Sequence, residues 1–280
     1  MSVELPEARI LAEQMNEVLP GKQIEACHVR DYERMQRIGF MNKDIGDYEE
    51  LVDGRIESVA SRGNTIHVRL DNGMNLLIAP EYGGAVLYHT SEDAATEKYH
   101  LRIDFADGTM LTVRLTSMGV IQAVDDDGLE ASYVYRRDFS ERLSPADEGQ
   151  FTLERFSELL SERNQQLKPV LVGKDAVVVG ISNSAFQDIA YRAGLHPKRR
   201  ASELTGDEGR ALYDAIKQLV QERIRLGGKD RFLDLHGRRG GYEPAMGPNM
   251  KQRACPRCGN PIEKMSYGGG QVYFCPGCQK

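Results

Sequence analysis

The segment Cys255-Pro-Arg-Cys258, followed after sixteen residues by Cys275-Pro-Gly-Cys278, holds four of the five cysteines in this 280-residue chain. Two residues between the cysteines of each pair allow a tight turn whose backbone amides point at the thiolates. Two such turns supply the tetrahedral four-sulfur shell that structural Zn²⁺ prefers. Because the protein provides all four ligands, we predict one closed, structural zinc site and not a catalytic one.

The stretch between the two pairs contains residues 266–274, in which a glycine turn runs into an alternating strand, so a β-hairpin is expected there. Two disulfides are the alternative to zinc. The first eleven residues contain Glu4, Glu7 and Arg9 and no apolar core, so no signal peptide is expected. Thiols of a cytosolic chain stay reduced, which favours zinc. Cys27, the fifth cysteine, is predicted to be a small buried apolar residue.

The net charge of −6 is the sum of two unlike halves. Residues 1–150 hold 28 acidic and 15 basic side chains, giving −13, whereas residues 151–280 hold 14 and 21, giving +7. A basic C-terminal half is the minimum electrostatic requirement for binding phosphates. A solvated basic surface without a partner is the alternative. No apolar run approaches the length of a membrane span, so no membrane partner is expected. We also expect the protein to be a cytoplasmic monomer.

The first 135 residues favour a helix followed by a β-rich region. Leu11, Met15 and Val18 recur at helical spacing within residues 5–19. Short alternating segments follow, separated by the hairpin-turn signals Asp71-Asn-Gly73 and Asp107-Gly108. The pattern predicts an antiparallel sandwich or barrel. The clearest expected strands span residues 55–60, 65–70, 101–105 and 110–115.

From about residue 140 the pattern changes to helices, which are expected at 151–163 with Thr152 as cap, at 183–193 and at 207–226. Residues 227–253 are rich in Gly and Arg and have little apolar periodicity, so we predict a mostly irregular linker. The predicted fold class is α+β. Its expected parts are an N-terminal helix with an antiparallel β-sandwich in residues 1–138, a helical domain in 139–250 and a zinc ribbon in 251–280.

Three segments together resemble the formamidopyrimidine-DNA glycosylase and endonuclease VIII family of base-excision repair enzymes. The first is Glu4-Leu-Pro-Glu7, and the third is the ribbon that ends in Phe274-Cys-Pro-Gly-Cys-Gln279. The second joins residues 180–188 to residues 191–197 and looks like the family's helix–two-turn–helix motif. Their order and spacing cover essentially the whole chain. The resemblance implies a DNA glycosylase with AP-lyase activity that binds double-stranded DNA.

The second segment also has a physical argument for binding phosphate. Gly180 and Asn183 lie where a helix starts, and unpaired backbone N–H groups and the helix dipole favour an anion there. Asn183 either caps the helix or donates its side-chain amide to a phosphate, and the resemblance assigns it the second role. The run Lys198-Arg-Arg200 adds phosphate contacts or is a solvated surface. Gln271 of the ribbon is a further predicted nucleic-acid contact.

The resemblance also implies a catalytic amine, which this chain changes. Family enzymes attack the sugar with the amine of an N-terminal proline, placed beside a carboxylate. Here Val3 precedes Glu4, and removal of Met1 would leave the amine on Ser2, one residue too early. One extra residue displaces the amine by up to about 3.5 Å, and a misplacement of about 1 Å can cost two orders of magnitude in rate.

Glu4 matches the family carboxylate that protonates the sugar ring oxygen, and Glu7 matches the motif's second glutamate. Alternatively, both are first-turn residues that the helix dipole favours.

Further positions differ from the family pattern. Asn64, in Arg62-Gly63-Asn64, stands where the family has a phosphate-binding lysine, and Gly270 stands where the ribbon has an arginine. Tyr82 and the pair Ser117-Met118 replace the residues that fill the hole left by an extruded base. Tyr82 and Met118 are candidates for a wedge in the base stack, or are simple packing residues.

Three functions are therefore considered. The first is a protein that binds damaged or distorted DNA with absent or reduced glycosylase and AP-lyase activity, associated with the nucleoid when bound. The second is an active glycosylase and AP lyase that uses the Ser2 amine with Glu4. The third is an RNA- or ribosome-associated binder, because the helix–two-turn–helix element also resembles one in a small-subunit ribosomal protein.

Overall fold

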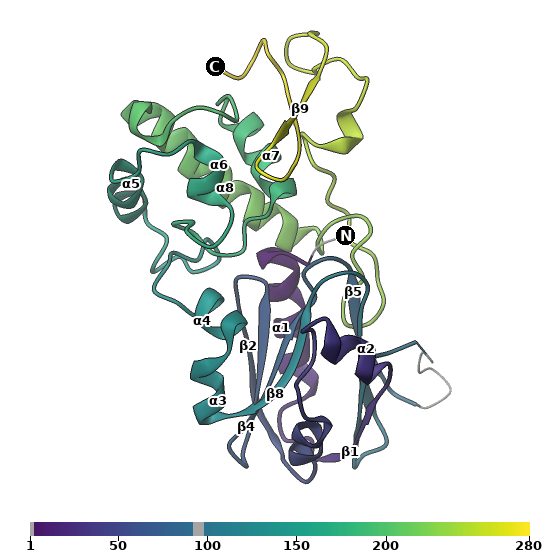
Figure 1. The fold of residues 1–280 in the computed structure, drawn as a ribbon. Coiled ribbons are helices and arrows are strands. Elements are labelled where there is room, and N and C mark those ends of the chain that lie inside the picture. The colour runs from purple at the N-terminus through teal and green to yellow at the C-terminus, as the bar shows by residue number, and fades with distance from the viewer. Residues whose placement is uncertain (1–2, 92–97) are drawn as a thin grey trace. The chain divides into compact units, whose positions relative to one another are not determined.

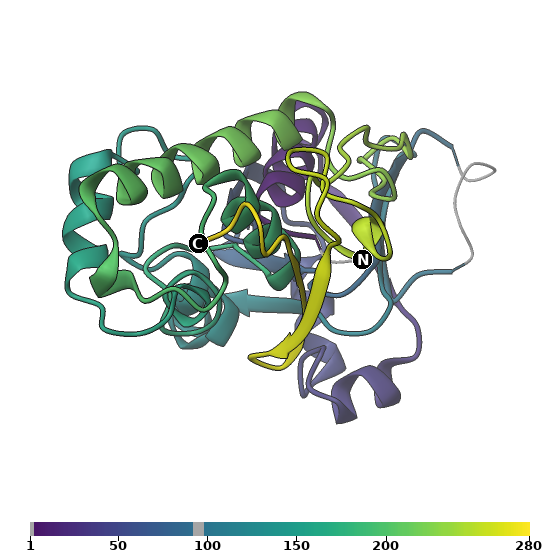
Figure 2. The same cartoon turned by 90° about the horizontal axis from the view of Figure 1, so that it is seen from above.

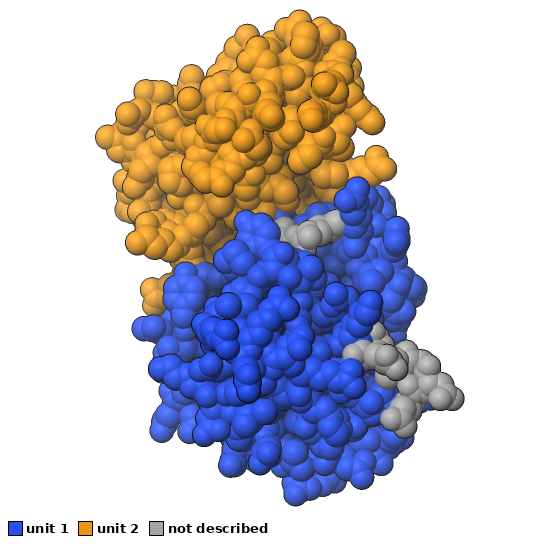
Figure 3. All heavy atoms as spheres, turned by 45° about the vertical axis from the view of Figure 1, so that its right-hand side comes forward, with its two compact units in different colours: residues 1–140, 224–241 blue, residues 141–223, 242–280 orange. Residues whose placement is uncertain are grey.

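The computed structural model describes residues 3–91 and 98–280 (Figure 1). The chain divides into two compact units, coloured separately in Figure 3. Unit 1 comprises Met1–Ser140 and Ile224–Gly241, and unit 2 comprises Glu141–Arg223 and Tyr242–Lys280. The chain thus leaves unit 1, returns to it for a short segment, and leaves it again.

Unit 1 begins with helix α1, Leu5–Val18, and continues into two four-stranded antiparallel sheets, which confirms the predicted sandwich. One sheet has the strand order β1-β6-β7-β5 and the other has the order β2-β3-β4-β8. The strands are β1 Ile24–Val29, β2 Ile56–Arg62, β3 Thr65–Leu70, β4 Met74–Ala79, β5 Gly84–His89, β6 Leu101–Phe105, β7 Met110–Leu115 and β8 Val120–Asp125.

The predicted hairpin turns lie where expected. Gly73 has φ +80° between β3 and β4, and Gly108 has φ +81° between β6 and β7, a backbone conformation that glycine adopts without strain. Helix α1 packs against β2 and β3. The core of unit 1 takes buried apolar side chains from α1 and from both sheets, including Leu11, Met15, Val68, Ile103 and Leu111.

Short helices complete unit 1: α2 Tyr32–Arg37, the 3₁₀ helix η1 Ile45–Leu51, α3 Asp126–Ala131 and α4 Tyr133–Asp138. The segment 224–241 packs into unit 1, although its residues 227–241 were predicted as part of a linker. Phe232 and Leu235 are buried in its core. Leu235 accepts a hydrogen bond from the Tyr88 amide of β5 (2.9 Å) and donates one to the Gln14 side chain of α1 (2.9 Å). The segment is irregular, but it is held to two regular elements.

Unit 2 contains helices α5 Leu153–Ser161, α6 Leu167–Leu171, α7 Asn183–Arg192 and α8 Gly206–Arg225, with 3₁₀ helices η3 Ala201–Glu203 and η4 Pro248–Met250. Thr152 caps α5 as predicted, since its hydroxyl accepts the Arg155 amide at 3.3 Å. Figure 2 shows α8 as one long uninterrupted helix. Its Tyr213 stacks on Phe151 with ring centres 4.8 Å apart.

The ribbon forms the predicted antiparallel hairpin from β9, Glu263–Tyr267, and β10, Gly270–Phe274. Gly268 and Gly269, with φ +53° and +76°, make its turn. The hairpin is held to α7 by Gln187, whose side-chain oxygen accepts the Tyr273 amide at 2.8 Å. Within residues 3–91 and 98–280, no helix is long and apolar enough to span a membrane.

Candidate nucleic-acid interface and zinc centre

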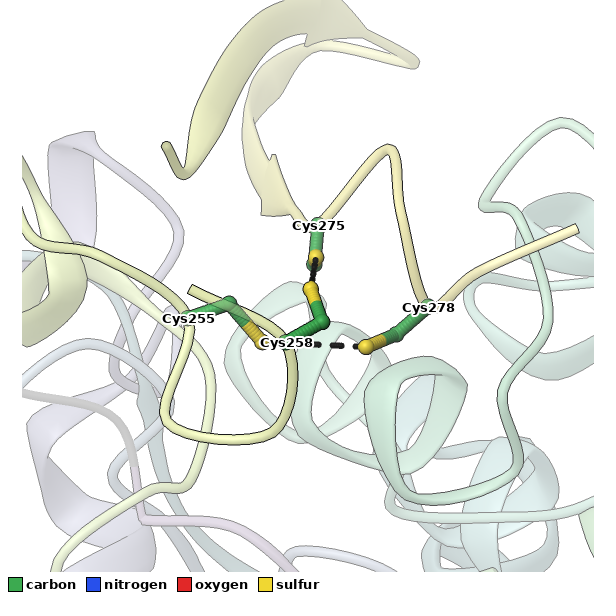
Figure 4. Close-up of side chains that lie close together, drawn as sticks. All are labelled: Cys255, Cys258, Cys275 and Cys278. Atoms are coloured by element: carbon green, nitrogen blue, oxygen red, sulfur yellow. Dashed lines mark hydrogen bonds between the residues drawn. The ribbon is translucent and has the colours of Figure 1, made fainter. Parts of the chain in front are cut away.

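The four ribbon cysteines converge on one point (Figure 4). Their sulfur atoms all lie within 4.8 Å of one another, with Cys255 to Cys278 at 3.8 Å and Cys258 to Cys275 at 3.4 Å. Zn–S bonds of about 2.3 Å in a tetrahedron place sulfurs about 3.8 Å apart, whereas a disulfide needs about 2.05 Å. The set therefore fits one structural Zn²⁺, and the disulfide alternative is wrong.

Side chains around the cysteines support metal binding. The Tyr191 hydroxyl lies 3.3 Å from the Cys255 sulfur. Burial opposes ionisation of Cys255, but hydrogen bonds from Tyr191 and from the amides of Arg257 and Cys258 lower the pKa of this thiol to about 6. Metal binding requires thiolates, and the shift at Cys255 is in that direction. Burial raises the pKa of Cys275, and the hydrogen bond with Cys258 raises the pKa of Cys278 to about 12, so the convergence of the four sulfurs is what supports the metal site. Tyr191 comes from α7, so the helix–two-turn–helix segment and the zinc centre are directly linked.

Asn183 does not cap α7, so that alternative is wrong. Ser182 is the cap, and its hydroxyl accepts the Ser184 amide at 3.1 Å. The Asn183 side-chain amide instead donates to the Gln271 carbonyl oxygen of β10 at 2.9 Å. A Cβ atom at Gly270 would lie 3.3 Å from the Asn183 amide nitrogen, so a larger residue there would press on this side chain. The phosphate role of Asn183 stays a prediction.

The predicted basic run lies between η3 and the end of α7, and its members differ in surroundings. Lys198 is exposed, with its ammonium 6.0 Å from the Tyr267 ring centre. Arg199 is paired with the Glu208 carboxylate at 3.2 Å, which compensates part of its charge. Exposed Arg200 donates to the Asn164 carbonyl at 3.0 Å. Gly180, with φ +74°, lies two residues before the α7 cap.

In unit 1, Tyr82 and Met118 lie on two neighbouring loops that are joined through their backbones. The Tyr82 amide donates to the Met118 carbonyl at 2.9 Å, and the Ser117 amide donates to the Tyr82 carbonyl at 3.2 Å. Both side chains are exposed, Tyr82 by 53% and Met118 by 48%. Side chains this exposed are not core packing residues, and the role of Tyr82 and Met118 as a wedge stays a prediction.

Asn64 has a cationic neighbour that the sequence did not reveal. Arg137 of α4 donates to the Asn64 side-chain oxygen at 2.6 Å and is paired with Asp138 at 2.8 Å and with Glu81. Burial opposes the charge, but Asp138 and Glu81 raise the pKa of Arg137. The negative charges of Asp138 and Glu81 therefore compensate the positive charge of the Arg137 guanidinium. No local signal predicts the contact, because 73 residues separate Asn64 from Arg137.

Glu4 and Glu7 are both buried at the start of α1, as is Lys229 in the returning segment. Glu7 accepts the Glu4 amide at 3.1 Å with Oε2 and the Lys229 amide at 3.2 Å with Oε1. The Lys229 ammonium nitrogen lies 3.5 Å from Glu4 Oε1 and 3.9 Å from Glu7 Oε2. The sequence prediction missed Lys229. The only signal was the preceding pair Gly227-Gly228, which permits a sharp turn at φ +72° and +87°.

The position before Glu4 is part of the fold of unit 1. Val3 is buried in the core, and its backbone N–H donates to the Pro80 carbonyl at 3.3 Å. This nitrogen is a peptide amide, because Ser2 precedes it. Ser2 itself lies outside the described residues, so its predicted catalytic role stays a prediction.

Three family models match the chain. The formamidopyrimidine-DNA glycosylase N-terminal domain matches residues 3–116, and the H2TH domain of the same enzyme matches residues 143–232. A zinc finger found in FPG and IleRS matches residues 254–280. The three matches follow the order of the N-terminal β-rich region, the helical region and the ribbon.

Relatives match over nearly the whole length. The formamidopyrimidine-DNA glycosylases of Pelotomaculum thermopropionicum and Roseiflexus sp. strain RS-1 are 28% and 29% identical, each over 99% of both chains. The crystal structure of the Lactococcus lactis enzyme bound non-covalently to DNA containing an AP site has a TM-score of 0.81 at 24% identity, over 99% of both chains. That likeness shows the fold. With the three models and the zinc-binding cysteines, these matches show that the chain belongs to the formamidopyrimidine-DNA glycosylase and endonuclease VIII family.

Proposed function

We propose that this protein binds damaged or distorted duplex DNA and that its glycosylase and AP-lyase activity is absent or reduced. The absent or reduced activity is inferred from the backbone nitrogen of Val3, the residue directly before Glu4. It is a peptide amide that donates a hydrogen bond to Pro80. An amide lone pair is delocalised into the carbonyl and does not attack a sugar. The attacking amine that the family resemblance implies is therefore missing from this position.

DNA binding is supported by the features that the chain keeps. Its relatives are DNA glycosylases, and the Lactococcus lactis protein was crystallised with AP-site DNA. The N-terminus of α7 offers backbone N–H groups and the positive end of a helix dipole, which suit a phosphate. Lys198 and Arg200 are exposed on the same unit. A phosphate-binding surface built in this way binds any duplex with a strong dependence on salt.

Selectivity for damaged duplex is supported by Tyr82 and Met118. Their exposed side chains stand on paired loops, as a wedge between bases requires. Entering a base stack costs a few kcal/mol per step and costs least where a base is missing or mispaired. A duplex with an abasic site should therefore bind more tightly than an intact one.

The test is a gel-shift titration of abasic and intact duplexes of the same sequence at several salt concentrations. We expect tighter binding of the abasic duplex and a linear fall of log affinity with log salt concentration. Lys198→Glu and Arg200→Glu should each lower the salt slope by about one. Arg210→Glu, on an exposed part of α8, is the matched control. Absence of binding to either duplex at low salt would refute the proposal.

The reduced activity is tested separately by base release. Duplexes with several oxidised bases are incubated with this protein and with the Pelotomaculum thermopropionicum relative. Strand breaks are then counted after alkali treatment. We expect release to be absent or at least about 100-fold slower, since misplacement of a reacting group by about 1 Å can cost that much. Equal rates would contradict the proposal.

A further inference from the structure

The N-terminus of α1 and the segment after α8 form a buried cluster in unit 1 that contains an amine and two carboxylates. The cluster consists of Glu4, Glu7 and Lys229, with the Lys229 nitrogen 3.5 Å from Glu4 Oε1. Lys229 is 6% exposed and Glu4 is 2% exposed. A buried primary amine with a carboxylate within reach provides both the nucleophile and the proton acceptor that Schiff-base formation with an aldehyde uses.

We propose that Lys229 supplies the amine that forms a Schiff base with the aldehyde of an abasic site, with Glu4 as its proton partner. This inference rests on the proposed binding of damaged DNA and names the reaction that accounts for any remaining lyase activity. It replaces the terminal amine with a side-chain amine next to the same glutamate. The ring-opened form of an abasic sugar provides the aldehyde, so no other reactant is needed.

The reaction balances with these two groups alone. The Lys229 ammonium first transfers one proton to the Glu4 carboxylate. The neutral nitrogen attacks the aldehyde carbon, a C–N bond forms, and a proton moves from nitrogen to the former carbonyl oxygen. Glu4 then returns its proton to that hydroxyl group, which leaves as water while the nitrogen lone pair forms the C=N bond. The product is an iminium ion beside an ionised Glu4.

Glu7 is a positioning residue in this scheme. One oxygen accepts the Lys229 amide and the other accepts the Glu4 amide, so a single carboxylate fixes the backbones of both reacting residues. The turn before Lys229 is tightly packed: a Cβ atom on Gly240 would lie 2.2 Å from the Gly228 carbonyl oxygen. The backbone is therefore held, while the flexible four-carbon stem of lysine lets the amine move toward a sugar. Shielding from water also slows hydrolysis of the imine.

The experiment is borohydride trapping on a duplex with a natural abasic site. Borohydride reduces the imine to a stable secondary amine, so the DNA remains attached to the protein. We expect an adduct with the unmodified chain, and digestion with mass spectrometry should place it on the peptide that contains Lys229. An adduct on the N-terminal peptide would overturn the proposal without any variant.

Variants separate the reaction from the ion pair. Lys229→Arg keeps a cation beside Glu4 but is not nucleophilic at neutral pH, and its adduct should fall to background. Lys174→Arg, at an exposed position of unit 2, should trap like the unmodified chain. Glu4→Gln should lower the trapping rate while binding is kept. A Lys229→Arg variant that still traps at the unmodified rate would also overturn the proposal.

Binding to a tetrahydrofuran analogue of the abasic site, which has no aldehyde, is measured in parallel. Lys229→Arg should bind it within about threefold of the unmodified chain. If the unmodified chain binds the analogue but forms no adduct with the natural site, this inference fails and the proposed function stands. If it binds neither duplex, both fail. If Lys229→Arg does not fold, as judged by its thermal transition, the peptide map of the unmodified chain still decides.

Discussion

Glu7 illustrates how a residue can be identified from the sequence while its role depends on a distant segment. The family resemblance picked out its position, and Glu7 lies in the first turn of α1, where its side chain accepts the Glu4 amide. Its second bond, to the amide of Lys229, joins residues 222 positions apart. No local pattern predicts a contact over that separation. The same reason hid Arg137 beside Asn64.

Glu7→Gln is expected to destabilise unit 1 by about 1–3 kcal/mol, the range for leaving a buried donor without its acceptor. The substitution replaces one of the two accepting oxygens with an NH₂ group. One of the two backbone N–H donors, of Glu4 or of Lys229, then has no acceptor. Urea unfolding followed by circular dichroism measures the change. Glu13→Gln is the control, because its pair with Arg9 is about half exposed and contributes about 0.5 kcal/mol or less. Equal effects of the two substitutions would contradict this role for Glu7.

Gly270→Arg tests the missing ribbon cation. The backbone of Gly270 has no positive φ, so an arginine can adopt it once the Asn183 side chain shifts by a few tenths of an ångström. We expect tighter duplex binding and a salt slope steeper by about one, for one added phosphate contact. Gly270→Ala adds the same Cβ without charge and should leave the slope unchanged. A slope that stays constant in both variants would place Gly270 away from DNA.

At the scale of elements, regular patterns were predicted well and irregular ones were not. Strands β3, β6 and β7 span the predicted residues, and Thr152 caps α5. Residues 227–241 are irregular as predicted, but their burial in unit 1 was missed because Phe232 and Leu235 come from irregular backbone, where burial has no period. Asn183 stayed one of two readings for the α7 cap because Ser182 and Asn183 are both good capping residues, and the structure shows Ser182 as the cap while Asn183 contacts Gln271.

The pairing of β6 with β7 should weaken in acid. His100, just before β6, accepts the Leu115 amide with Nδ1 at 2.9 Å, a bond that needs the neutral ring. Burial, helped by Arg114 and Arg34 and opposed by Asp31, lowers the pKa of His100 below 6.5. The unfolded chain therefore binds a proton at a higher pH than the native chain, and stability falls as pH drops below about 6.5.

Urea unfolding at pH 7 and pH 5 measures this effect. His100→Gln keeps an acceptor for the Leu115 amide but does not titrate, so its stability should fall less between the two pH values. His236→Gln is the control, because His236 lies in the returning segment and its ring is not buried. An equal fall in the His100→Gln variant and the unmodified chain would show that His100 does not contribute.

For the whole molecule, zinc removal should affect the two units unequally. All four ligands belong to unit 2, and binding of structural zinc contributes about 10–16 kcal/mol to the folding of such modules. Cys258→Ser should lose zinc, unfold the ribbon and reduce DNA binding, while unit 1 keeps its own thermal transition. A colorimetric zinc assay and calorimetry measure these outcomes.

Cys27→Ala is the matched control for zinc removal. Cys27 lies in β1 away from the four converging sulfurs, and it is partly buried against the core of unit 1, not fully buried as predicted. One zinc per chain should remain in that variant. Full zinc content in Cys258→Ser, or a simultaneous loss of both thermal transitions, would contradict the assignment. The predicted domain limits at residues 138 and 250 stay predictions, because sequence patterns reveal elements and not which unit a segment joins.

The return of the segment 224–241 to unit 1 has a consequence during synthesis. A growing chain emerges from the ribosome in order, at about 5–20 residues per second. Unit 1 lacks Phe232 and Leu235 until residue 241 has emerged, about a hundred residues after Ser140. Its sandwich therefore stays incomplete for roughly 5–20 s, while the helices of unit 2 emerge. The nascent chain must hold an open apolar core during this interval, when a chaperone that recognises exposed apolar surface would bind it.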